Sequence, residues 1–172
     1  MAKEHPARYG TWQLTLHWLV VLLVTVQFIF NESMSDAYEV GVRTGEVPSG
    51  EGGVFPHAVV GISIFLAMSA RLWLRLGRGV PPAPSSEPRW MQVISRANHW
   101  AFYGILIAMP PVGILALLTL EPVFGALHGW AARILLALIA LHVAGALLHA
   151  FRRDSDAHRR MLRAYADEPP ES

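Results

Sequence analysis

Apolar residues are gathered into four long blocks along the chain. The blocks cover residues 12–30, 55–76, 99–120 and 123–151. A helix needs about 20 residues to cross a hydrocarbon core that is about 30 Å thick, and each block is long enough to do so. The pattern therefore predicts an all-α integral membrane protein, built as one four-helix bundle without a second domain or an internal repeat.

The segments between the blocks are polar and rich in turn-forming residues. Residues 31–54 are rich in Glu, Gly and Ser and predict a loop. Residues 77–90 contain PPAPSSEP, which predicts an extended connector. The Glu121-Pro122 pair predicts a tight turn, and the Pro110-Pro111 pair inside the third block predicts a kink.

The first block could instead be the apolar core of a signal peptide. It is longer than the apolar region of most signal peptides, and the residues after it, NESMSDAYEV, contain no small-residue cleavage motif. We therefore interpret it as a retained helix. Residues 1–11 and 152–172 are then polar ends outside the membrane, the second of them a basic tail.

Basic residues predict the orientation of the bundle. Four spans place both ends of the chain on one side, and cytoplasmic segments carry the excess of Lys and Arg. Segment 31–54 has only Arg43 against five acidic residues. We therefore expect N-in, C-in topology in a bacterial inner (plasma) membrane. The basic residues that flank the expected cytoplasmic side are Lys3, Arg8, Arg71, Arg75, Arg78, Arg89, Arg96, Arg152, Arg153, Arg159, Arg160 and Arg163.

Composition agrees with a membrane protein and limits its chemistry. The chain of 172 residues is 53% hydrophobic and 16% charged, whereas about a quarter of the residues in soluble domains are charged. It contains no cysteine, which excludes disulfides, thiolate-held iron–sulfur clusters and covalent haem attachment. Any metal or haem must be held by nitrogen or oxygen, and no nucleic-acid partner is expected.

Four histidines fall at two depths in the predicted bundle. His128 and His142 lie fourteen residues apart in the last block. This spacing puts them within about 40° of each other on one helix face and ~21 Å apart along the axis. In the predicted topology His57 matches the outer level of His128, and His17 matches the inner level of His142. Each level thus draws one imidazole from the last span and one from another span.

This arrangement suits two flat macrocycles, each ligated by two imidazoles between helices. We therefore predict two haem groups, the outer on His57 and His128 and the inner on His17 and His142. Other interpretations stay open. A buried histidine can simply hydrogen-bond between helices. Zinc or copper would usually take three or four ligands, and a proton or ion conduit would favour acidic residues, which the spans lack.

Two further histidines and two arginines are candidate contacts for haem propionates or a quinone. His149 lies ~10 Å beyond His142, too deep to pair with His17, and is expected at the inner rim. His99 opens the third block at the same surface. Both also fit solvated interfacial positions. Arg133 near the outer face could pair with propionates of the outer haem or snorkel to the head groups. Arg71 could serve the inner haem in the same way.

Several short motifs occur along the chain beside the paired histidines. They are LHW at 16–18, His57 with Gly61, Arg71 to Arg75 before the proline-rich segment, AMPPVG at 108–113, the His128–His142 spacing, LHVAGALLHAF at 141–151 and RRML at 159–162. Together these motifs resemble the bacterial cytochrome b561 family of di-haem four-helix membrane cytochromes, which includes superoxide oxidase. The resemblance covers nearly all of residues 10–163 and implies haem b ligation by the four paired histidines.

The resemblance implies an oxidoreductase that moves electrons between a small donor on the periplasmic side and a quinone such as ubiquinone. Superoxide is one candidate donor, although an acidic 31–54 segment would repel it except near the cations Arg43 and Arg133. The alternative is a non-catalytic cytochrome b subunit, which anchors a larger redox complex and carries its electrons. In that case segment 31–54 would dock the redox partner protein.

Overall fold

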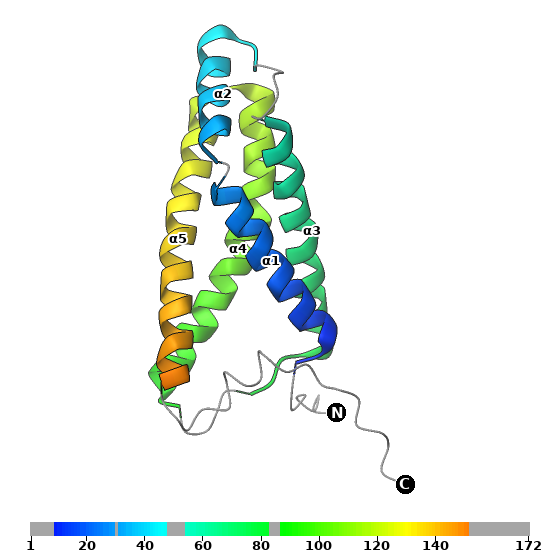
Figure 1. Ribbon diagram of the computed structural model, residues 1–172, viewed down its shortest axis with the longest axis vertical. Helices are drawn as coiled ribbons and strands as arrows, with labels where there is room; N and C mark the ends of the chain where they lie inside the picture. The colour runs from blue at the N-terminus through cyan, green and yellow to red at the C-terminus, as the bar shows by residue number, and fades with distance from the viewer. Residues whose placement is uncertain (1–8, 30, 48–53, 83–86, 152–172) are drawn as a thin grey trace.

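The structure is a bundle of helices whose long axes run roughly side by side (Figure 1). The computed structural model describes residues 9–29, 31–47, 54–82 and 87–151, and within these ranges all regular secondary structure is helical. Four helices, α1, α3, α4 and α5, are long and apolar enough to cross a membrane. This confirms the predicted all-α membrane bundle. The helices are α1 (Thr11–Ile29), α2 (Asn31–Thr44), α3 (Val54–Arg78), α4 (Arg89–Thr119) and α5 (Pro122–Phe151).

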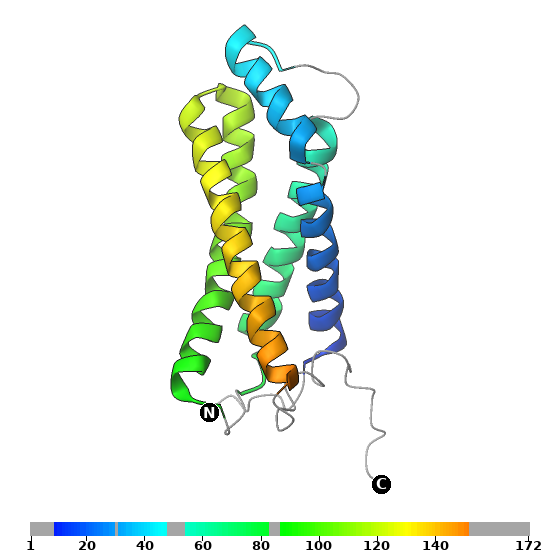
Figure 2. The same cartoon turned by 60° about the vertical axis from the view of Figure 1, so that its left-hand side comes forward.

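Consecutive helices pack against each other, α1 on α3, α3 on α4 and α4 on α5. Helix α1 begins and α5 ends at one end of the bundle, which we call the terminal end (Figures 1 and 2). Helix α2 and the turn between α4 and α5 lie at the other, the α2 end. Few contacts join α5 directly to α1 or α3 in the described part of the chain. The two pairs of helices α1/α3 and α4/α5 are therefore joined mainly through the contact between α3 and α4.

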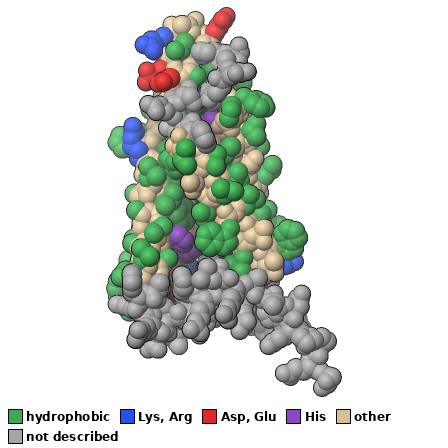
Figure 3. All heavy atoms as spheres, viewed as in Figure 1, with side chains coloured by type: hydrophobic (Ala, Val, Ile, Leu, Met, Phe, Trp, Pro, Cys, Tyr) green, Lys and Arg blue, Asp and Glu red, His purple; other side chains and the backbone are tan. Residues whose placement is uncertain are grey.

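The buried core lies mainly on α1, α3 and α4. Its residues recur three or four apart, the spacing that places them on one helix face. Leu135 is the one buried side chain of α5 among those described. Most apolar side chains lie on the outside, as Figure 3 shows along the middle of the bundle, which suits a surface that faces lipid. The core consists of Val20, Val24, Ile64, Ala67, Met68, Tyr103, Leu106 and Leu135.

Helix α2 corrects the prediction of a loop over residues 31–54, because Asn31–Thr44 is helical. Its Glu, Ser and Gly content hid a helical period that turns Tyr38 and Gly41 inward and leaves Asp36 and Glu39 exposed. The Tyr38 hydroxyl donates to the Glu121 carbonyl at 3.1 Å. Helix α2 thereby rests on the α4–α5 turn and covers one end of the bundle.

Helix α4 begins at Arg89, ten residues before the predicted start of the third span. Pro88 precedes it, a residue type that suits the start of a helix, but the mixed polarity of residues 89–98 resembles a connector. The helix continues through Pro110 and Pro111 to Thr119. Leu120 then adopts φ 54° and α5 starts at Pro122, so the predicted tight turn is present. The early start moves His99 ~15 Å into the helix.

The close fit of Tyr38 against Gly125 gives a first prediction. A Cβ atom added at Gly125 would overlap the Tyr38 ring, with its hydroxyl oxygen 2.8 Å away. Gly125→Ala should therefore push α2 from the α4–α5 turn and destabilise the protein by about 1–3 kcal/mol. Gly129→Ala is the matched control, because the nearest atom to its added Cβ is an Arg133 nitrogen at 4.0 Å. Thermal unfolding in detergent, followed by circular dichroism, should show a lower midpoint for Gly125→Ala alone; equal midpoints would contradict the packing.

Candidate functional site

Two histidines of helix α5, His128 and His142, each face a histidine of another helix. The ring centres of His57 on α3 and His128 on α5 are 6.0 Å apart. The ring centres of His17 on α1 and His142 on α5 are 6.3 Å apart. The structure thus brings together the residues that the depth argument paired, and their assignment as ligands stays a prediction. We call them the α2-end pair (His57, His128) and the terminal-end pair (His17, His142).

Helix α4 orients the α5 member of the α2-end pair. The His128 Nδ1 atom lies 3.1 Å from the Met109 carbonyl oxygen. Since a carbonyl can only accept, Nδ1 carries the proton and donates it, which leaves the Nε2 lone pair free for a metal. A Cβ added at Gly113 would lie 3.1 Å from His128 Cε1 and 3.2 Å from Nδ1. Gly113 therefore provides the room that the ring occupies.

The backbone of His57, the other member of this pair, is hydrogen-bonded to α1. The Gln27 amide of α1 donates to the His57 carbonyl at 3.0 Å, and Gly61 lies one turn further along α3 beside the same amide. The His57 Nδ1 atom is buried and has no hydrogen-bond partner among the described residues. A buried ring nitrogen without a partner is unfavourable, which suits a site built around a group outside the polypeptide.

The terminal-end pair has more neighbours. The His142 ring lies 5.2 Å from the His99 ring and 5.5 Å from the Phe102 ring, both on α4. His99 was predicted at the surface where the third span opens, and this placement is wrong because α4 starts at Arg89. The proline before Arg89 was the sequence signal that could have placed His99 at this depth.

Arg71 lies close to this group of imidazoles. It is half-buried and interacts electrostatically with His17, His99 and His142. One of its guanidinium nitrogens donates to the Gln13 carbonyl at 3.2 Å. A cation held at this position is suited to meet a carboxylate or a carbonyl oxygen of a ligand.

The other predicted contacts lie apart from the pairs or outside the description. Arg133 is exposed, and its guanidinium carbon lies 4.9 Å from the centre of the Trp130 ring, an arrangement that suits a snorkelling cation at the membrane surface. The His149 side chain lies outside the described residues, as does the tail 152–172.

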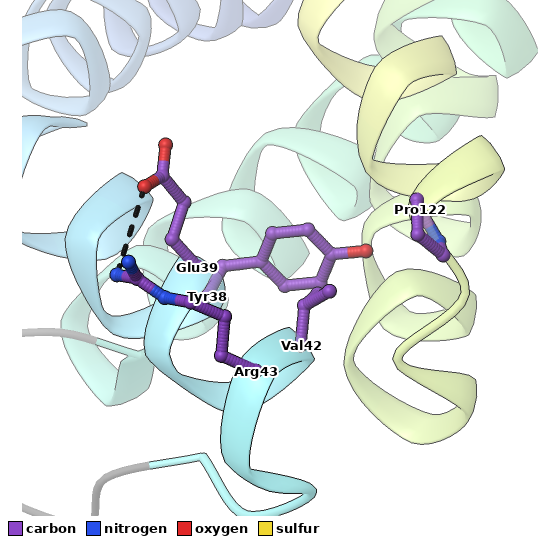
Figure 4. A pocket seen from close by; sticks show the side chains of 5 residues that line it. All are labelled: Tyr38, Glu39, Val42, Arg43 and Pro122. Carbon is purple, nitrogen blue, oxygen red and sulfur yellow. Dashed lines mark ion pairs between the residues drawn. The ribbon is translucent and has the colours of Figure 1, made fainter.

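A shallow cavity lies at the α2 end, between α2 and the start of α5 (Figure 4). It is lined by Tyr38, Glu39, Val42, Arg43 and Pro122, and has a volume of about 280 Å³. Within it Arg43 and Glu39 form an exposed ion pair at 4.0 Å. None of the paired histidines lines this cavity, so it is separate from the two histidine levels.

The histidine pairs have the dimensions of bis-imidazole ligation. Two imidazoles that bind one metal from opposite sides, each through a bond of about 2 Å, have ring centres roughly 6 Å apart. Open space surrounds Gly145, one turn from His142, because a Cβ added there would meet no atom within 4 Å. Among the described residues no three His, Asp or Glu side chains are arranged to hold a bare metal ion. The residues therefore fit a flat macrocycle at each pair better than an isolated ion.

Comparison with known proteins gives a match over most of the chain. Residues 8–164 match the profile of a family described as prokaryotic cytochrome b561. The matched range includes all five helices and both histidine pairs.

Individual relatives share low sequence identity with this chain, and two of them match it over about nine-tenths of its length. Cytochrome b562 of Cereibacter sphaeroides is 28% identical over 155 residues, which is 90% of this chain and 95% of the relative. Cytochrome b561 homolog 2 of Escherichia coli K12 is 25% identical over 180 residues, 91% of this chain and 92% of the relative. A Yersinia pestis protein named "Probable superoxide oxidase CybB" is 26% identical over 113 residues, 64% of this chain and 58% of the relative.

Proposed function

Because the chain belongs to the prokaryotic cytochrome b561 family, we propose that this membrane b-type cytochrome holds two haems and carries electrons between a small donor at the outer surface and a quinone. The observation that supports it is the repetition, at two levels of α5, of a histidine pair with the spacing of bis-imidazole ligation. Membership of the family makes the protein a bacterial multi-pass electron-transfer cytochrome. We propose in addition that it holds two haems on the four paired histidines, lies in the inner membrane and reacts with a quinone.

The four histidines determine what each level can do. Haem b, when bound, supplies reversible one-electron chemistry. His57 and His128 would hold one haem at the α2 end, and His17 and His142 would hold the other at the terminal end. Two histidines holding each haem would leave no place for oxygen or another small molecule to bind the iron, and so would favour outer-sphere electron transfer. The protein contributes ligation, burial and spacing.

The terminal end is the better place for the quinone. Arg71 there is half-buried and interacts electrostatically with three imidazoles, and donor groups of this kind suit either haem propionates or quinone oxygens. In the N-in, C-in topology that the basic residues predict, this end faces the cytoplasm. The α2 end then faces the periplasm and receives or delivers electrons there.

The charge of the α2 end favours a cationic donor or partner. Exposed carboxylates surround α2, and the cation Arg43 is paired with Glu39. Such a surface repels superoxide and attracts positive groups. It also supports a second candidate function, an electron-carrier subunit that anchors a partner with a basic surface. The exposed acidic residues are Asp36, Glu39, Glu46 and Glu121.

Reduction of the purified protein in detergent tests the proposal and separates the two functions. We expect a ubiquinol analogue to reduce the haems under anaerobic conditions, followed by stopped-flow absorbance, and Arg71→Gln to slow this step about tenfold. Superoxide, supplied separately, should react more slowly at low ionic strength than at high ionic strength. Haem spectra that respond to neither reductant, in a protein that co-purifies with a redox partner, would favour the carrier subunit and contradict quinone chemistry.

A further inference from the structure

His99, a half-buried residue of α4, lies against His142 at the level of the terminal-end pair. The two rings are nearly perpendicular, at 88°, and their centres are 5.2 Å apart. This is shorter than the 6.3 Å between His142 and His17. Two imidazoles joined by an N–H···N hydrogen bond of ~2.9 Å have ring centres roughly 5 Å apart. The His99–His142 spacing thus suits a hydrogen bond, whereas the His17–His142 spacing suits a shared metal.

The backbone fixes which nitrogen of His99 can accept a hydrogen bond. His99 Nδ1 lies 2.6 Å from the Ser95 carbonyl oxygen, one turn earlier on α4. The carbonyl can only accept, so Nδ1 carries the proton. In a neutral imidazole the other nitrogen, Nε2, then presents its lone pair as an acceptor.

Helix α4 already performs this task at the other level. There the Met109 carbonyl accepts from His128 Nδ1. At the terminal end, α4 is also fixed to the turn of α5 that precedes His142, because the buried Asn98 amide donates to the Leu138 carbonyl at 3.4 Å. Metal-bound histidines usually donate their second ring N–H to such an acceptor. His142 has a candidate for it in His99.

We propose that His99 is the positioning residue of the terminal-end haem, accepting a hydrogen bond at Nε2 from His142 Nδ1. The inference rests on the proposed function, since it takes His142 as an axial ligand. The resulting chain runs from the Ser95 carbonyl through His99 to His142. Helix α4, which supplies no axial ligand, thereby orients both ligands of α5, one through a backbone carbonyl and one through a side chain.

This bond has a chemical consequence beyond orientation. An acceptor at His142 Nδ1 fixes the tautomer that offers Nε2 to iron and makes the imidazole a stronger electron donor. A stronger donor stabilises ferric over ferrous iron and lowers the reduction potential of the haem on this pair. The reduction potential of the haem on the α2-end pair, some 20 Å away along α5, should not change.

A redox titration of the full-length protein with both haems bound tests the proposal. His99→Leu should retain two haems but destabilise the ferric form of one of them about tenfold, which raises its potential by ~59 mV. His99→Gln, which restores an acceptor oxygen, should recover part of the shift. Phe102→Leu is the matched control: it removes the other α4 ring that packs on His142, but no acceptor, and should leave both potentials near the wild-type values.

Three outcomes would overturn the proposal. One is two unchanged potentials in His99→Leu. Another is an equal shift in Phe102→Leu, which would indicate packing alone. The third is loss of one haem from both His99→Leu and His99→Gln with full retention in His17→Ala, which would make His99 an axial ligand itself. If His99→Leu does not fold, His99→Phe, which also lacks an acceptor, takes its place, and two unchanged potentials there count as the first outcome. Wild-type protein without haem would instead refute the proposed function, before His99 is tested.

Discussion

Replacing His142 with alanine is expected to remove one of the two haems and leave the other fully bound. The same result is expected for His17→Ala, His57→Ala and His128→Ala, because each change takes away one of two axial ligands at its level. The haem content per chain should fall by half in each variant, measured by the alkaline pyridine haemochrome assay. His149→Ala, seven residues after His142 in the sequence, is the control and should retain both haems.

Double variants show which histidines share a haem. His57→Ala combined with His128→Ala should lose no more haem than either change alone, since both residues serve the α2-end pair. His57→Ala combined with His142→Ala should lose both haems. Residues that act as a unit are strongly non-additive in this way. If the combination within one pair removed both haems, the assignment of ligands to levels would be wrong.

Gly113→Val is expected to weaken the haem of the α2-end pair selectively, by about 10- to 100-fold. An added Cβ would lie 3.1–3.2 Å from two atoms of the His128 ring, and the branched side chain would push the ring away from the Met109 carbonyl that orients it. Gly104→Val, on the same helix, is the matched control because a Cβ added there meets no atom within 4 Å.

Titration of haem into the depleted protein gives the two affinities separately. In Gly113→Val the haem affinity of the α2-end pair should fall and that of the terminal-end pair should stay unchanged. Both affinities of Gly104→Val should equal those of the wild type. Equal affinities in Gly113→Val and wild type would mean that the His128 ring does not depend on this glycine for its position.

The spans and the histidine pairs could be predicted because both depend on counting along apolar helices. A block of about 20 apolar residues has one favourable arrangement in a bilayer, and this fixes the depth of each residue in it. His17, His128 and His142 lie several residues inside such blocks, and His57 lies near the start of its block. The two levels are about 20 Å apart, so errors of one or two residues in the ends of the helices do not exchange them.

Other features depend on positions that composition does not reveal. His99 was expected at the first residue of the third helix, but α4 starts ten residues earlier, which puts His99 ~15 Å from the start of the helix. Residues 89–98 are too polar to be assigned to a span by hydropathy alone. Helix α2 was missed because its polar residues conceal a helical period. The Met109 carbonyl and Gly113 contacts with His128 depend on the rotation of α4 against α5, which packing sets only in the folded protein.

The central claim is that α5 shares two bis-histidine haems with α1 and α3. Electron paramagnetic resonance of the oxidised protein, combined with its haem-to-protein ratio, tests this most directly. We predict two haems per chain, both low-spin, with one low-spin signal lost in His142→Ala and the other in His128→Ala. A single haem per chain, or a high-spin signal of full intensity in the wild-type protein, would contradict it.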